Sequence, residues 1–455
     1  MVKRRIVSFL KGDLFATAAS FAAQVVIRLG ASLILTRVLK PEAYGVVTIV
    51  SSIGVIVGLL ADIAVTTSLV RHERGDDPVY LNTAWTLRLG RALLNTVLMY
   101  CAAPLIAALY RTPELTFPLR VYSPWFLIWA LESMSFPLAI RRRNSRVIVY
   151  SELVANTAAT AFTLLYCYST HDYMGMVYGI LVNRLLLTVF SYGFYRDVRP
   201  RLTFDREAAR ALLHFTRYAV PSSLLTLALN QFDKIVLLRL FNLNLLGVYG
   251  LAANIASPIE GLTNKVSQLV LYPRCAHEFR TAANTFALRY YTRNVAVFIS
   301  ILALPAVVGG ASQLLVGVLY DPRYAQAGMI LQAFMVRAAL FALSTPAESM
   351  LIASGELQVQ LNGNLFRAAS MIVGMVAGYF LAGFMGFVYG AVLSGLPPLL
   401  YLWWLQRRKG YFNLRYELYK VTCLLVIAGL SFLASNLLLS WLPEHHSLRS
   451  IWKHR

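Results

Sequence analysis

Three arginines lie deep inside long apolar runs of the sequence: Arg28, Arg184 and Arg337. A charged side chain at the centre of a membrane-spanning helix costs about 2.5–3.5 kcal/mol to insert, so each arginine needs a partner or a water-filled cavity. A guanidinium group stays protonated and offers a planar fork of donors that fits phosphate oxygens. The three arginines therefore predict a site for an anionic ligand, with a pyrophosphate preferred to a neutral sugar.

The alternative interpretation is that each arginine forms an ion pair inside the membrane. Glu132, Glu260 and Glu348 lie in apolar runs and would supply the carboxylates. The sequence leaves both interpretations open. Two uncharged polar residues, Gln24 and Asn230, are assigned with the arginines to substrate binding, because polar groups in such helices can hydrogen-bond a ligand.

Four further charged residues are predicted to have gating or structural roles. Arg37 and Arg239 lie at the ends of apolar runs, where an arginine can also reach the lipid headgroups. Asp62 and Asp233 lie within or late in such runs, and Asp233 is expected to form an ion pair. No catalytic or metal-binding residues are predicted, because the sequence has no P-loop, HExxH or GxSxG motif and its four cysteines are widely spaced.

The composition defines the elements that must hold these residues. The 455 residues have 58% hydrophobic and only 14% charged residues, and their mean hydropathy is +0.60, so the chain is expected to be an integral membrane protein. The apolar runs have lengths near the roughly 20 residues that a helix needs to cross a bilayer. The predicted fold is therefore an all-α polytopic membrane protein with 12–14 spans. These spans fall near residues 13–36, 43–65, 85–109, 117–140, 147–168, 173–195, 212–238, 244–271, 292–319, 327–352, 361–382, 384–405 and 416–441.

The net charge of +21 comes mostly from short basic clusters between the apolar runs. This distribution argues against nucleic-acid binding and follows the positive-inside bias of membrane proteins. Alternate loops are rich in arginine, which predicts a multi-pass protein with a cytoplasmic N-terminus. Because no loop between the predicted spans is long enough for a soluble catalytic domain, the function is expected to be carried out within the membrane.

A weak internal repeat predicts two lobes. At an offset of 202 residues, the segment from Arg37 to Val46 matches the segment from Arg239 to Val248. The repeat unit holds six spans, so both copies enter the membrane in the same orientation, which is a known plan among secondary transporters. The expected domains are six-helix lobes at residues 1–205 and 206–410 in a pseudo-two-fold arrangement, followed by an additional C-terminal span and tail at 411–455.

Residues from about 10 to 110 contain a pattern made of Gly12, Arg37-x-Leu39, Pro41-Glu42-x-Tyr44-Gly45, and Ala61-Asp62 followed by Ser68-Leu69-Val70. This pattern resembles the oligosaccharide-flippase (polysaccharide exporter, Wzx-like) family of the multidrug/oligosaccharidyl-lipid/polysaccharide superfamily. The resemblance implies a membrane transporter of a bacterial inner membrane rather than an enzyme. Such a flippase moves a polyprenyl-pyrophosphate-linked oligosaccharide from the cytoplasmic to the outer leaflet by alternating access, for exopolysaccharide or O-antigen-type biosynthesis. No cofactor is expected, although H+ or Na+ is a possible coupling ion, and other polysaccharide assembly proteins are possible partners.

Two alternative functions remain open at this point. A multidrug or cation antiporter of the same superfamily would need a cavity dominated by carboxylates, and the excess of deep arginines argues against it. A membrane oligosaccharide polymerase or ligase would need a large outward loop with candidate acids or bases, and none is present between the predicted spans.

Overall fold

A computed structural model describes residues 2–59, 68–69, 74–142, 144–194, 200–281, 285–356 and 358–441. All regular structure in these residues is helical, which confirms the predicted all-α fold class. The chain divides into two compact units, Met1–Gly247 and Val248–Arg455. The domain boundaries at 205 and 410 stay a prediction.

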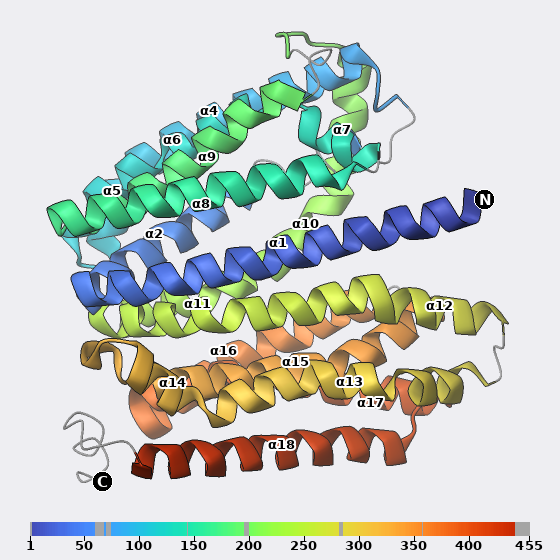
Figure 1. Ribbon diagram of the computed structural model, residues 1–455. Coiled ribbons are helices and arrows are strands. Elements are labelled where there is room, and N and C mark those ends of the chain that lie inside the picture. The colour runs from blue at the N-terminus through green and yellow to red at the C-terminus, as the bar shows by residue number, and fades with distance from the viewer. Residues whose placement is uncertain are drawn as a thin grey trace. The chain divides into compact units, whose positions relative to one another are not determined.

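The first unit is built from long helices that pack side by side (Figure 1). Its helices are α1 (Val2–Val38), α2 (Pro41–Leu59), α4 (Pro78–Leu109), α5 (Thr116–Tyr122), α6 (Pro124–Leu131), α7 (Ser135–Arg141), α8 (Ser145–Thr170), α9 (Met174–Phe194) and α10 (Arg206–Leu240), with the short 3-10 helix η1 (Pro113–Leu115). The contacts run in order from α1 to α8, α9, α6 and α4, and α10 packs on α2 and α4. This order places α9 next to α6, where the charged residues described below meet.

The single span predicted at 117–140 is wrong in one respect, because this segment is interrupted. Helix α6 ends at Leu131 and α7 begins at Ser135, and Glu132 between them has the non-helical angles φ −55° and ψ 133°. A break in a membrane helix leaves backbone groups without their helical partners, so other elements must supply hydrogen bonds.

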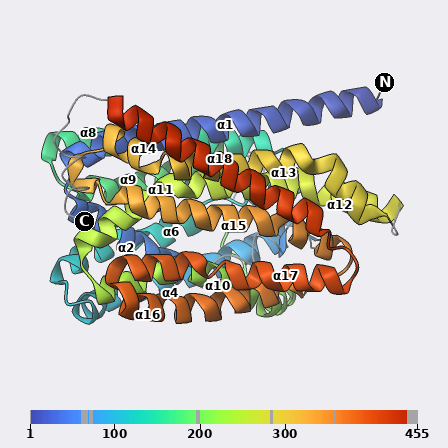
Figure 2. The same cartoon turned by 90° about the horizontal axis from the view of Figure 1, so that it is seen from below.

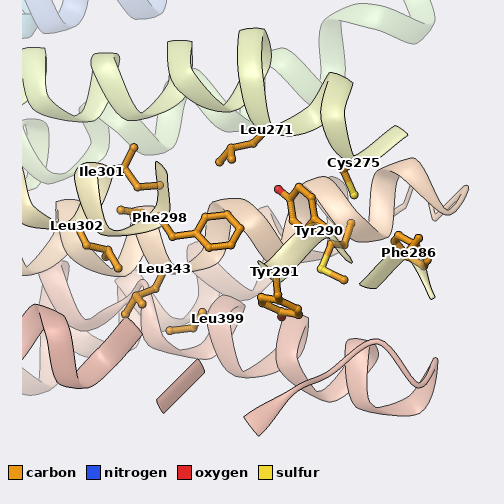
Figure 3. Close-up of a cluster of buried hydrophobic side chains, with 12 residues drawn as sticks. Leu271, Cys275, Phe286, Tyr290, Tyr291, Phe298, Ile301, Leu302, Leu343 and Leu399 are labelled. Carbon is orange, nitrogen blue, oxygen red and sulfur yellow. The ribbon is translucent and has the colours of Figure 1, made fainter. Parts of the chain in front are cut away.

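The second unit continues from α11 and has its own buried core. Its elements are α11 (Leu243–Val266, which begins in the first unit), the π-helical turn η2 (Ser267–Leu271), α12 (Tyr272–Thr281), α13 (Phe286–Gly310), α14 (Ser312–Leu319), the 3-10 turn η3 (Pro322–Tyr324), α15 (Ala327–Ala353), α16 (Val359–Leu393), α17 (Leu396–Arg408) and α18 (Leu414–Trp441). Four aromatic residues of α13 pack there with aliphatic side chains, and Tyr290 and Phe298 lie near the centre of the cluster (Figure 3).

Helix α16 contains a chain reversal that accounts for two predicted spans. Ala382 and Gly383 leave the helical conformation, and Gly383 takes φ +57°, which glycine adopts at little cost. On either side of the reversal, the backbones at Gly374 and Gly390 meet, and α17 lies beside α16 (Figure 2). The predicted boundary between spans 361–382 and 384–405 therefore coincides with this turn.

The extra C-terminal span is a helix of full length. Among the described residues, ten helices are long and apolar enough to cross a membrane, and Leu414–Ser440 of α18 is one of them. Helix α18 packs along α13 (Figure 2). Residues 442–455 lie outside the described part of the chain, so the predicted position of the tail stays a prediction.

The two matching segments of the repeat form the turn between α1 and α2 and the turn between α10 and α11. These two repeat corners lie against each other within the first unit. Asn244 donates from Nδ2 to Oε1 of Glu42 at 2.8 Å, and these two residues are 202 positions apart. Gly45 packs so closely on the carbonyl group of Leu243 that a side chain there would overlap it, and Gly247 packs in the same way on the first turn of α2. The repeat detected in the sequence therefore corresponds to a reciprocal contact in the structure.

Candidate functional site

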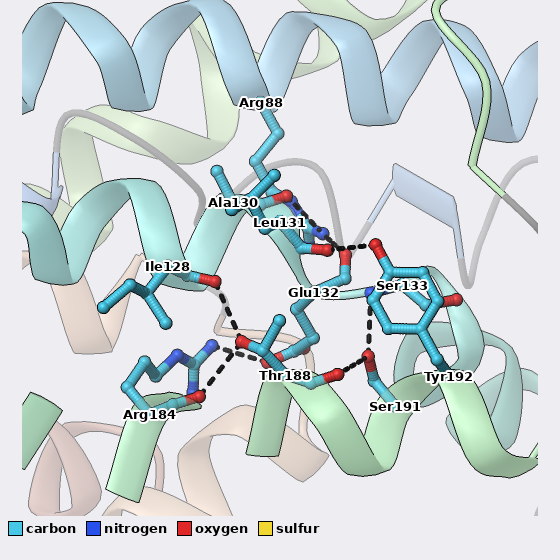
Figure 4. A network of polar contacts seen from close by, with 10 residues as sticks. All are labelled: Arg88, Ile128, Ala130, Leu131, Glu132, Ser133, Arg184, Thr188, Ser191 and Tyr192. Atoms are coloured by element: carbon cyan, nitrogen blue, oxygen red, sulfur yellow. Dashed lines mark hydrogen bonds and ion pairs between the residues drawn. The ribbon is translucent and has the colours of Figure 1, made fainter. Parts of the chain in front are cut away.

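The break between α6 and α7 is held by side chains from neighbouring helices (Figure 4). Arg88 of α4 donates from Nη2 to the carbonyl oxygen of Ala130 at 3.1 Å and to the carbonyl oxygen of Glu132. The backbone N–H of Ser133 donates to Oγ of Ser191 on α9 at 2.9 Å. The Arg88 side chain is buried, with its residue only 2% exposed. The donors of Arg88 are therefore used inside the unit.

Helix α9 supplies two further hydrogen bonds to the last turn of α6. The Thr188 hydroxyl donates to the carbonyl oxygen of Ile128 at 2.8 Å, and the Tyr192 hydroxyl donates to that of Leu131 at 2.6 Å. These bonds replace the intrahelical bonds that the break removes. The interruption is therefore a stable feature of this span.

Arg184 of α9 is placed at the end of α6 by an ion pair and two indole rings. Its Nη2 lies 2.7 Å from Oε2 of Glu132. Its guanidinium carbon lies 5.1 Å from the ring centre of Trp129 and 5.7 Å from that of Trp125, within the range of cation–π attraction. The side chains of Arg184 and Glu132 are 15% and 7% exposed. Both tryptophans therefore contact this arginine through their rings.

The group formed by Arg88, Glu132 and Arg184 carries more positive than negative charge. Arg184 pairs with the Glu132 carboxylate, and Arg88 donates to the Glu132 backbone carbonyl beside that pair. The Nε atom of Arg88 is buried without a hydrogen-bond partner among the described residues. Surplus positive charge in a poorly solvated site attracts an anion. The arrangement can therefore bind an anionic group next to Arg184.

Gln24 is joined to α8 and α9 by a chain of side-chain hydrogen bonds. Asn183, the residue before Arg184, donates to Asn156 at 2.7 Å, and Asn156 donates to Oε1 of Gln24 at 3.1 Å. Arg28 follows Gln24 by four residues on α1 and is exposed on this unit. The structure thus links predicted residue Gln24 to the neighbour of Arg184.

Arg337 lies in the second unit and also pairs with a carboxylate. Its Nε is 2.9 Å from Oε1 of Glu260 on α11, and its guanidinium carbon lies 4.6 Å from the ring centre of Phe334. Two of the three predicted arginines therefore have the carboxylate partners that the alternative interpretation named. The ion pair holds the Arg337 guanidinium group in place. Binding of an anion by Arg337 stays a prediction.

The remaining predicted residues lie at or near helix ends. Arg37 and Arg239 are exposed at the ends of α1 and α10. Asn230 of α10 is exposed, and its carbonyl oxygen accepts from Nζ of Lys234 at 3.1 Å. Asp233 is buried, and its Oδ1 accepts the backbone N–H of Lys234 at 2.9 Å. Asp62 lies outside the described residues. The gating roles of these residues stay predictions.

Comparison with known proteins gives a consistent result. The family model described as "Polysaccharide biosynthesis protein" matches residues 34–328. The lipopolysaccharide biosynthesis protein WzxC of Escherichia coli (strain K12) is 22% identical over 363 residues, which are 79% of this chain and 73% of WzxC.

Solved structures show the same fold at low sequence identity. The lipid II flippase MurJ in an inward closed conformation has a TM-score of 0.66 and 13% identity, covering 98% of this chain and 96% of MurJ. A multidrug resistance MATE family transporter in an inward-facing conformation has a TM-score of 0.63 and 16% identity, covering 85% of this chain and 94% of that transporter. The chain thus has the two-lobe fold of these transporters.

These findings sort the functions that the sequence left open. The chain is a multi-pass bacterial membrane transporter and not an enzyme, which sets aside the alternative of a membrane polymerase or ligase. The family model covers more than half of the chain, including the repeat corners and the broken span. The chain therefore belongs to the polysaccharide biosynthesis protein family, the Wzx-like polysaccharide exporters that its first hundred residues resemble.

Proposed function

We propose that this chain moves a polyprenyl-pyrophosphate-linked oligosaccharide from the cytoplasmic to the outer leaflet of a bacterial inner membrane. The family match and the similarity to WzxC support a polysaccharide precursor as the class of substrate. Transport proceeds by alternating access, with the pyrophosphate and the glycan passing through the protein and the polyprenyl tail remaining in lipid. The glycan serves exopolysaccharide or O-antigen-type biosynthesis.

The observation that carries this proposal is the surplus positive charge around Arg184. Arg184 pairs with the Glu132 carboxylate, and the Arg88 guanidinium lies beside this pair on the Glu132 backbone carbonyl. The two indole rings lie within cation–π range of the Arg184 guanidinium. A guanidinium edge binds phosphate oxygens through parallel, charge-assisted hydrogen bonds. A pyrophosphate is therefore the part of the substrate that this site recognises.

A cation exporter fits these residues poorly. Such a protein needs carboxylates that can accept a cationic ligand, and both Glu132 and Glu260 already hold a guanidinium group. The fold that the chain shares with a MATE transporter does not distinguish the two substrates.

The test is glycan export in cells whose export depends on this chain. Replacing Arg28, Arg184 or Arg337 with alanine is expected to abolish export and to leave the lipid-linked oligosaccharide in the inner leaflet. Arg289→Ala is the control, because Arg289 is an exposed arginine near the start of α13. Immunoblotting of membranes establishes that each variant is made.

A second variant separates loss of binding from loss of folding. Arg184→Ala leaves Glu132 as an unpaired buried charge, whereas Arg184→Ala combined with Glu132→Gln leaves no such charge. The double variant is expected to accumulate in the membrane and still fail to export. Normal export by the three single variants and by the triple arginine variant would refute the proposal.

A further inference from the structure

We propose that the segment leading into α10 binds the bilayer surface, with two apolar side chains at the level of the headgroups and three arginines on anionic headgroups. This linker surface consists of Leu202, Phe204, Arg201, Arg206 and Arg210. Its partner is an anionic phospholipid of the leaflet on the side where α4 and α10 begin. The inference goes beyond the proposed function and does not depend on which substrate is transported.

The segment has a defined position against α4. Three alternate backbone N–H groups donate to side-chain oxygens of α4 at 3.0–3.1 Å. The donors belong to Arg201, Thr203 and Asp205, and the acceptors belong to Asn82, Thr86 and Thr83, respectively. Such alternation is typical of an extended chain, and Asp205 has the extended angles φ −102° and ψ 125°. The direction of the side chains in between is therefore fixed.

Leu202 and Phe204 are two of these side chains, and both are uncovered. They lie two positions apart, so in an extended chain they point to the same side, and they are 73% and 65% exposed. Phe204 precedes Asp205, the N-cap residue of α10, and an apolar residue in this place often packs on the fourth residue of the helix. That residue is Ala209, which is buried, and the exposure of Phe204 shows that this contact is not its role.

The hydrogen bonds place the segment at the edge of the hydrocarbon layer. Helix α4 has 32 residues and is therefore about 48 Å long. The hydrocarbon core of a bilayer is about 30 Å thick, so about 9 Å of a centred α4 extends beyond it at each end. Asn82 and Thr86, which hold the segment, lie about 6 and 12 Å from the start of α4. The segment therefore lies at the boundary between headgroups and acyl chains.

Three arginines are exposed next to the apolar pair. Arg201 precedes Leu202, and Arg206 and Arg210 lie one turn apart on the same side of α10. Within the part of the chain that the structure describes, none of the three forms an ion pair. Their positive charges therefore face outward beside apolar surface.

The two acidic residues of the segment have other roles. Oε2 of Glu207 lies 3.5 Å from Nη1 of Arg74. Oδ1 of Asp205 accepts the backbone N–H of Ala208 at 3.0 Å and so caps α10. The three arginines are therefore available for an anion from outside the protein.

An anionic lipid is the partner that fits this combination of depth, apolar surface and charge. Segments that lie in the plane of a bilayer surface bury their apolar groups about 5–10 Å into the boundary of the acyl chains and keep basic groups beside them. Arginine near such a surface is attracted to anionic headgroups. A soluble protein could reach Leu202 and Phe204 only by displacing the lipid around them.

The experiment places a fluorophore on the linker surface. The full chain, with its four cysteines replaced by alanine, carries Phe204→Cys labelled with bimane. It is reconstituted in nanodiscs that contain equal amounts of phosphatidylglycerol and phosphatidylcholine, with only one of the two lipids brominated at a time. Brominated lipid is expected to quench the label, because bromine quenches on contact. Phosphatidylglycerol is expected beside the label about fivefold more often than phosphatidylcholine, as one arginine near an anionic surface would give.

Two variants serve as controls. A label at Glu207→Cys, on a neighbouring residue whose side chain is 84% exposed, is expected to be quenched by iodide from the water and not by brominated lipid. The combination of Arg201→Gln, Arg206→Gln and Arg210→Gln is expected to leave the quenching at position 204 in place and to make the two lipids equally effective.

The wild-type chain provides a measurement that needs no substitution. In the same nanodiscs, hydroxyl radicals are expected to spare Phe204 relative to His277, an exposed residue of α12, although Phe204 is 65% exposed on the protein itself. Equal labelling of the two residues would overturn the insertion of this segment.

Two results of the quenching experiment would also overturn the proposal. A label at position 204 that iodide quenches and brominated lipids do not would show that the linker surface faces water, where a soluble partner could reach it. Equal quenching by the two brominated lipids in the presence of all three arginines would refute the recognition of anionic headgroups. Neither result bears on the pyrophosphate site.

Discussion

Replacing Gly247 with alanine is expected to destabilise the protein, because this residue lies where the two corners of the repeat meet. A Cβ at Gly247 would lie 2.7 Å from the carbonyl carbon of Pro41 and 2.9 Å from the backbone nitrogen of Gly45. Ordinary contacts between carbon atoms are about 3.5–4.0 Å long. The neighbouring atoms belong to the backbone, so the overlap is relieved only if the first turn of α2 moves away from α11.

The expected size of the effect follows from two opposing terms. Overpacking of this kind costs about 1–3 kcal/mol, whereas alanine in place of glycine in a helix gains about 0.5–1 kcal/mol. The overlap outweighs the gain, so the free energy of unfolding is expected to fall. The unfolding entropy is about 2.1 cal/mol/K per residue, which for 455 residues gives a shift of about 1 °C for each kcal/mol. The apparent Tm in detergent is therefore expected to fall by about 1–2 °C.

The controls are Gly30→Ala in α1 and Gly90→Ala in α4, because a Cβ at either position meets no heavy atom within 4 Å. Both variants are expected to unfold at the wild-type temperature or above it. The assay is thermal unfolding of the purified chain, followed by intrinsic fluorescence. An apparent Tm for Gly247→Ala as high as that of the two controls would show that the two corners are not in contact.

Two further substitutions test buried charges by the same unfolding assay. Arg88→Met removes the donor to the carbonyl oxygens of Ala130 and Glu132. The free energy of unfolding is expected to fall by about 1–3 kcal/mol for each carbonyl group left without a partner. An unchanged apparent Tm would contradict the role of Arg88. Lys420→Met removes one partner of the ion pair with Glu417, whose two side chains are 3% and 2% exposed. The free energy of unfolding is expected to fall by about 3–5 kcal/mol, because a buried carboxylate is left unpaired. The double variant with Glu417→Gln is expected to recover most of this stability. Equal losses in the single and double variants at this pair would contradict that expectation.

The sequence determined the class of fold and the positions of most helices. A chain with 58% hydrophobic and 14% charged residues cannot cover a soluble globule, so helices in a bilayer were the expected solution. The reversal at Gly383 and the last helix from Leu414 were also within reach of prediction. Both depend on local features: a residue that tolerates positive φ and an apolar run long enough to cross a bilayer.

The repeat was also visible in the sequence, although its meaning required the structure. An offset of 202 residues relates the corners, and only the coordinates show that Glu42 and Asn244, which are related by that offset, bond to each other. The same holds for Gly45 and Gly247, whose lack of a side chain permits close contact between backbones. Sequence similarity between two segments does not determine whether they touch, because that depends on how the intervening helices fold back.

For the candidate site too, the sequence and the tertiary structure determined different features. The sequence alone identified Arg184 and Glu132 as charges that need a partner, because an isolated charge in an apolar helix is unfavourable whatever its surroundings. Only the tertiary structure decided that they pair, across 52 positions in the sequence, and that Arg88 stabilises the broken span from 44 positions away. Pro137 is a local signal for the break, because it has no N–H to bond the carbonyl group of Ser133. The side chains of α4 and α9 that satisfy the carbonyl groups at the break are brought alongside only by the folding of the unit.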